Sequence, residues 1–123
     1  MILGIGPRVD WKTKTNKQLV AGFLELQTAD EVERFLRDLM TPTEIKEFAN
    51  RLEAARLLSR DVQYNAISES TGLSSTTIAR IAKWLYGSLG GYRLILKRIT
   101  LNQSKLGTGH SNSSQLRKGL SWN

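Results

Sequence analysis

The chain has 123 residues, of which 40% are hydrophobic, so its length suits one small domain with a modest core. It contains no cysteine and a single histidine, which excludes disulfides, thiolate metal sites and histidine clusters. The sequence has no glycine-rich phosphate loop, no nucleophile with a histidine partner and no paired catalytic carboxylates. We therefore expect a protein that is not an enzyme and that uses no metal.

The formal net charge of +7 is distributed unevenly along the chain. Residues 1–18 carry +3, residues 19–86 carry −2 and residues 87–123 carry +6. Basic flanks around a nearly neutral middle suit contact with nucleic-acid phosphates, although such flanks also simply keep a protein soluble. No apolar run reaches the length of a membrane span, and the apolar start is too short for a signal peptide, so we expect a cytoplasmic protein.

The first part of the chain predicts an irregular segment followed by two helices. Residues 1–15 contain two glycines and a proline and are expected to be irregular. A helix is expected over 16–27, where Gly22 either weakens the helix or lets another helix pack closely against it. A second helix is expected from Thr28, which has the spacing of a capping box with Glu31. Its apolar side consists of Val32, Phe35, Leu36 and Leu39.

A third helix is expected to begin at Thr41 and to run to about Arg60. Thr41 is the predicted N-cap, Pro42 occupies the first helical position, and Glu44 completes a capping box. The apolar residues of this helix extend around more than one side, which is typical of a central helix or of a dimer core. They are Ile45, Phe48, Ala49, Leu52, Ala55, Leu57 and Leu58.

The stretch from 63 to 85 predicts a helix, a tight turn and a second helix. Gly72 falls where the turn needs a residue without a Cβ atom, and the apolar Leu73 follows it. Ser74 and Ser75 are suitable N-caps for the second helix. Ile78, Ile81 and Leu85 are spaced three and four residues apart, so they form one buried stripe.

The other face of that second helix carries short polar or basic side chains, which fit against base edges and phosphates in a DNA major groove. The pattern is therefore typical of a DNA-binding helix-turn-helix, although an ordinary helical hairpin shares part of it. The residues on this face are Ser75, Thr76, Ala79 and Lys83.

The end of the chain predicts a corner, a short element and a tail. Gly87 is expected to end the recognition helix, and Gly90 with Gly91 to form a flexible corner. The apolar stretch over 92–99 is expected to be helical, with an extended arm as the alternative. Residues 100–123 are rich in Ser, Asn and Gly and are expected to form a mobile basic tail. The predicted helical domain therefore covers residues 16–99.

Two segments of the sequence resemble Trp-repressor-like proteins, and in particular the YerC/YecD branch of small bacterial regulators. They cover residues 38–58 and 66–96, and their markers are TPTE at the third helix start, NRLE within that helix, TTIAR in the recognition helix and YG..GGY after it. The resemblance implies an all-α, Trp-repressor-like helical bundle that contains the helix-turn-helix and forms an intertwined homodimer. It also implies binding to double-stranded DNA and transcriptional repression, and hence association with the nucleoid.

By position in that family, the DNA-binding residues lie at the start of the first helix of the motif and along the recognition helix. Ser75, Thr76 and Ala79 would face bases, and Tyr64 and Asn65 would lie near the DNA backbone. The full predicted set is Tyr64, Asn65, Ser74, Ser75, Thr76, Thr77, Ala79, Arg80 and Lys83.

The resemblance also points to a ligand site, from which this sequence departs. The Trp repressor holds L-tryptophan between two arginines, and Arg51 and Arg80 fill those positions. Ile81, however, replaces the glycine that leaves room for the indole, and Trp84 replaces a pocket serine. We therefore expect no tryptophan corepressor. We interpret the two arginines as ion-pairing or phosphate-contacting residues, with ligand binding as the alternative.

The sequence thus predicts a homodimeric DNA-binding transcriptional regulator. The alternative is a protein-interaction module that keeps the fold without specific DNA binding. Short polar side chains on the exposed face of the recognition helix favour the first interpretation.

Overall fold

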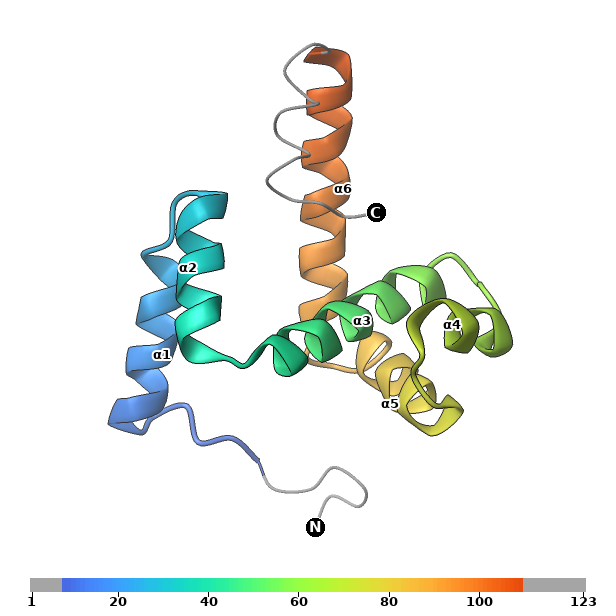
Figure 1. The fold of residues 1–123 in the computed structure, drawn as a ribbon, viewed down its shortest axis with the longest axis horizontal. Coiled ribbons are helices and arrows are strands. Elements are labelled where there is room, and N and C mark those ends of the chain that lie inside the picture. The colour runs from blue at the N-terminus through green and yellow to red at the C-terminus, as the bar shows by residue number, and fades with distance from the viewer. Residues whose placement is uncertain (1–7, 110–123) are drawn as a thin grey trace. The chain divides into compact units, whose positions relative to one another are not determined.

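The computed structural model describes residues 8–109, and this part of the chain contains six α-helices and no strand (Figure 1). The predicted all-α fold class is therefore confirmed. The expectations for residues 1–7 and 110–123 lie outside the described residues. The helices are α1 (Lys14–Leu24), α2 (Ala29–Leu39), α3 (Pro42–Leu58), α4 (Tyr64–Thr71), α5 (Ser75–Leu85) and α6 (Gly91–Gly109).

The chain divides into two compact units, and the first of them ends at Phe35. Within it, the rings of Phe23 in α1 and Phe35 in α2 pack edge to face, with centroids 5.3 Å apart and planes at 82°. A Cβ atom on Gly22 would lie 3.4 Å from the ring of Phe35. Gly22 therefore allows α2 to pack closely against α1. Close packing was one of the two roles predicted for this glycine.

The first helix begins earlier than predicted, and the second begins directly after the predicted Thr28 with an incomplete capping box. Helix α1 begins at Lys14, two residues early, since the hydroxyl of Thr13 accepts the Asn16 N–H at 3.2 Å. The predicted box at the start of α2 forms only in part. The hydroxyl of Thr28 accepts the Glu31 N–H at 3.1 Å, but the Glu31 carboxylate accepts the N–H of Gln27 instead of that of Thr28.

The second unit begins at Leu36 and contains the long helix α3. The predicted capping box at its start is confirmed in both directions. The Thr41 hydroxyl accepts the Glu44 N–H at 3.1 Å, and the Glu44 carboxylate accepts the Thr41 N–H at 2.9 Å. The N–H and the hydroxyl of Thr41 both donate to the ionised carboxylate of Glu44, and these two hydrogen bonds lower the pKa of Glu44.

The core of the second unit lies where α3, α4 and α5 meet (Figure 1). Helix α6 contacts both α3 and α5. Burial of the apolar side chains in this core is the main force that holds helix α5 in place. The buried apolar residues are Ala54, Ala55 and Leu58 of α3, Ile67 of α4, and Ile78, Ile81 and Leu85 of α5.

The polar tail was expected to begin at residue 100, but helix α6 continues past this point. It runs from Gly91 to Gly109, so the ten residues that follow Ile99 are helical in the structure. The reason is that propagating a helix costs far less than nucleating one. The apolar residues at its start, with Tyr92 and Leu96 packed on the core, supply the nucleus from which the polar part continues.

Candidate nucleic-acid interface

The predicted helix-turn-helix is present as α4, a three-residue turn and α5. Gly72 lies in the left-handed region, with φ at +77°, and its N–H donates to the carbonyl of Ser68 at 2.8 Å. A side chain at this position would be strained by the positive φ. The prediction that the turn needs glycine here is therefore confirmed.

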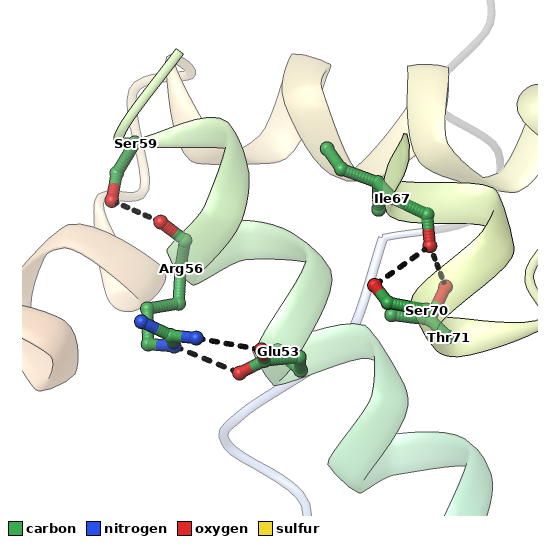
Figure 2. A network of polar contacts seen from close by, with 6 residues as sticks. All are labelled: Glu53, Arg56, Ser59, Ile67, Ser70 and Thr71. Atoms are coloured by element: carbon green, nitrogen blue, oxygen red, sulfur yellow. Dashed lines mark hydrogen bonds and ion pairs between the residues drawn. The ribbon is translucent and has the colours of Figure 1, made fainter. Parts of the chain in front are cut away.

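Two hydroxyl side chains close the turn by bonds that the sequence analysis missed. Thr71, which is 8% exposed, donates to the Ile67 carbonyl at 2.7 Å and accepts the Leu73 N–H at 3.2 Å. Ser68 donates to the Leu73 carbonyl at 2.8 Å. Figure 2 shows Thr71 and Ser70 converging on the carbonyl of Ile67. The available signal was a hydroxyl residue directly before the turn glycine.

The recognition helix α5 begins at a hydroxyl cap. Ser74 accepts the Thr77 N–H at 3.2 Å, and its own hydroxyl donates to the Thr77 hydroxyl at 3.1 Å. Thr77 is half-buried, whereas Ser74 is exposed. These two predicted DNA-binding residues therefore have hydroxyls that are already used in holding the helix start.

Helix α5 presents one apolar face to the core and one polar face to solvent. Ile78 and Ile81 are 0% exposed and Leu85 is 2% exposed, which confirms the predicted buried stripe. The opposite face combines small, polar and basic side chains, and the helix contains no acidic residue. Such a face can approach an anionic backbone without charge repulsion. Its exposed predicted residues are Ser75, Thr76, Ala79, Arg80 and Lys83.

The two remaining predicted DNA-binding residues begin helix α4. Tyr64 is 41% exposed and Asn65 is exposed. The N-cap residue Gln63 makes no side-chain hydrogen bond to the first turn. The first backbone N–H groups of a helix have no partner within the helix, and a phosphate oxygen is one of the groups that can accept them.

The basic residues of the second unit fall into two electrostatic classes. Arg56 is neutralised, because it binds both carboxylate oxygens of Glu53 at 2.8 and 2.7 Å (Figure 2). This hydrogen-bonded pair lowers the pKa of Glu53 and raises the pKa of Arg56. By contrast, Arg80 and Lys83 on α5 form no ion pair with any residue that the structure describes. Their charges are therefore available to an external anion.

The two arginines of the predicted ligand site lie on different helices, α3 and α5. Arg51 pairs with Glu47 at 2.7 Å and lies 5.7 Å from the ring centroid of Phe48. Burial raises the pKa of Tyr92, and the nearby charge of Arg51 opposes that rise. Arg80 lies on the exposed face of α5. Arg51 thus forms an ion pair within α3, and the roles of Arg51 and Arg80 stay predictions.

The two residues that depart from the tryptophan pocket behave differently. Ile81 is fully enclosed in the core, as its place in the stripe predicts. Trp84 is 48% exposed in the single chain. The reason is its position on the helix, four residues after the exposed Arg80 and therefore on the same side.

Residues 8–109 can also be examined for a metal site and for a membrane-spanning helix. Over that range, no three His, Cys, Asp or Glu side chains gather where they could hold a metal ion. No helix in the same range is long and apolar enough to cross a membrane.

Comparison with known proteins places this geometry in a family. A model of the Trp repressor protein family matches residues 14–100, which is more than half of the chain. The chain belongs to the Trp repressor family. Proteins of this family are regulatory DNA-binding proteins. This confirms the resemblance found in the sequence.

Two similar proteins support the assignment of this chain to the Trp repressor family. YerC of Bacillus subtilis strain 168, an uncharacterized protein, is 38% identical over 82 residues, which cover 67% of this chain and 79% of YerC. The crystal structure of a TrpR-like protein from Eubacterium eligens superposes with a TM-score of 0.68 at 35% identity. That match covers 73% of this chain and 93% of the other.

Proposed function

We propose that this Trp repressor family member is a sequence-specific transcriptional regulator that represses genes by binding double-stranded DNA. The observation that carries the proposal is the face of α5, where exposed Thr76, Ala79 and Lys83 lie opposite a fully buried isoleucine stripe. The buried stripe fixes which side of the helix faces outward. The exposed side then offers short groups to base edges and cations to phosphates. Binding of this kind would place the protein on the nucleoid.

Selection of genomic fragments with the purified protein tests this proposal. We expect a small set of fragments to be enriched that share one sequence, with two half-sites if the protein binds as a dimer. Enrichment of fragments without any common sequence would contradict specific binding. It would favour the protein-interaction module as the function of this fold.

We also propose that the protein acts as a homodimer. In the single chain, α1 and α2 contain no buried residue. Four apolar side chains of α1 are substantially exposed, and apolar surface of this kind marks an interface that another chain covers. They are Leu19 at 39%, Val20 at 43%, Phe23 at 43% and Leu24 at 79%.

Light scattering across a dilution series is expected to report a dimer at micromolar concentration without DNA. Val20→Asp should shift the protein toward monomer, because a carboxylate would have to be buried in the contact. Gln18→Asp adds the same charge two residues away on the other side of α1, and should leave the dimer intact. A wild-type protein that is a monomer throughout would contradict the homodimer.

We further propose that DNA binding does not depend on L-tryptophan. Ile81 is 0% exposed, so an indole at this position would have to displace a β-branched side chain from the core. Overpacking a core typically costs about 1–3 kcal/mol. Expelling the isoleucine side chain would add the loss of its burial, about 1.5–3 kcal/mol. Together these costs leave little net affinity for so small a ligand.

Calorimetry with L-tryptophan is accordingly expected to show no saturable binding below millimolar concentration. Titration of a selected DNA fragment should give the same affinity with and without the amino acid. Saturable sub-millimolar binding that also tightens the DNA complex would contradict this proposal and would restore Arg51 and Arg80 as a ligand pair.

A further inference from the structure

The C-terminal end of the recognition helix is attached by a side chain from the following helix. Arg93, in the first turn of α6, donates a hydrogen bond through its guanidinium to the carbonyl of Leu85, the last residue of α5. The last carbonyls of a helix lack partners within the helix and carry partial negative charge. A guanidinium there satisfies one carbonyl and also opposes the negative end of the helix dipole.

The turn between α5 and α6 is shaped to admit this contact. Gly90 has φ at +73°, and a Cβ atom there would lie 3.0 Å from the Arg93 guanidinium. A side chain at position 90 would therefore be strained and would also crowd the arginine. Gly87 is equally constrained, because a Cβ atom would lie 2.9 Å from the carbonyl of Lys83. Both glycines keep the turn close to the end of α5.

A second hydrogen bond ties the same end of α5 to helix α3. Tyr86, the C-cap of α5, donates its hydroxyl to the carbonyl of Leu58 at the end of α3, at 3.3 Å. The end of the recognition helix is thus tied to α3 through Tyr86 and to α6 through Arg93. The hydrogen bond from Arg93 is charge-assisted, and bonds of this type are stronger than neutral ones such as the bond from Tyr86.

We propose that Arg93 is a positioning residue for DNA recognition, which sets the orientation of α5 without contacting DNA. The inference rests on the proposed DNA-binding function. The buried stripe fixes rotation of α5 about its own axis, but a stripe along one side still allows the helix end to tilt. Tethering Leu85 removes that tilt. Base contacts require placement within about 0.5 Å, whereas a long flexible lysine can follow a phosphate.

The test compares Arg93→Gln and Arg93→Lys with Arg98→Gln. Arg98 is an exposed arginine of the same helix and has no hydrogen bond or ion pair to the described residues, so its variant controls for charge. Each protein is titrated on a selected duplex and on a scrambled duplex at several salt concentrations. Thermal melts confirm that each variant is folded at the titration temperature.

Arg93→Gln is expected to reduce the preference for the selected duplex by about tenfold, which corresponds to about 1.4 kcal/mol. The dependence of affinity on salt should match that of Arg98→Gln. Arg93→Lys should recover most of the preference, because an ammonium can also bind the Leu85 carbonyl. A uniform loss on both duplexes, with a salt slope lower by about one unit than that of Arg98→Gln, would overturn the inference and make Arg93 a phosphate contact.

A measurement without DNA tests the tether itself. The N–H groups of Tyr86 and Gly87 donate to the carbonyls of Ala82 and Trp84 at 3.1 and 3.2 Å. Hydrogen exchange of these two amides should accelerate about tenfold in Arg93→Gln and remain unchanged in Arg98→Gln. Unchanged exchange in Arg93→Gln would overturn the inference. A wild-type protein without duplex preference would instead contradict the proposed function, so the two failures can be distinguished.

Discussion

Replacing Ile81 with alanine is expected to lower the free energy of unfolding by about 2–5 kcal/mol. Ile81 is 0% exposed and lies in the cluster that joins α5 to α3 and α4. The substitution removes three carbon atoms from a fully enclosed position, so the protein loses their burial and gains a cavity. For a small domain, this is a large part of the total stability.

Chemical denaturation followed by circular dichroism measures this effect. Lys83→Ala is the matched control, because it shortens an exposed side chain two residues later on the same helix. It should change stability by no more than about 0.5 kcal/mol. Equal destabilisation by the two substitutions would mean that α5 does not bury the isoleucine stripe. The assignment of its outward face would then fail.

Thr76→Ala and Lys83→Ala are expected to weaken DNA binding in different ways. Thr76 is assigned to base edges, so its loss should reduce discrimination between duplexes by about 1 kcal/mol for each contact. Lys83 is assigned to phosphate, so its loss should weaken all duplexes alike and lower the salt slope by about one unit.

Titrations on selected and scrambled duplexes at several salt concentrations separate the two roles. Lys46→Ala is the control for charge, because Lys46 is exposed on α3, outside the predicted DNA-binding face. It should leave affinity and salt slope close to the wild-type values. The assignment would be refuted if Thr76→Ala and Lys83→Ala had equal effects on every duplex.

The features that could be predicted from the sequence depend on residues that are close along the chain. The capping box joins Thr41 to Glu44, and the cap of α5 joins Ser74 to Thr77, each over three residues. The left-handed turn is a property of Gly72 alone. Local geometry determines such features, so a short stretch of sequence is enough to indicate them.

The tethers of the recognition helix could not be predicted in the same way. Tyr86 reaches a carbonyl 28 residues away, and Arg93 reaches one eight residues away across a turn. Both bonds depend on how three helices pack, and a carbonyl acceptor leaves no mark in the sequence. The sequence therefore indicated the outward face of α5 but not what holds its end.

Trp84 shows a different limit. By its position in the family it replaces a pocket serine, and in the single chain its side chain is 48% exposed. A matching position in the family indicates where a residue lies on a helix, but it does not indicate how far its side chain is buried. Ile81, three residues earlier, belongs to the periodic apolar stripe, and for this residue the burial followed from the spacing alone.

The affinity of the wild-type protein for a selected duplex, relative to a scrambled duplex of the same composition, tests the central claim most directly. Measured by competition at physiological salt, the ratio is expected to be at least about 10³, as for specific DNA-binding proteins. A ratio near one, with binding that only follows salt, would contradict sequence-specific recognition by α5.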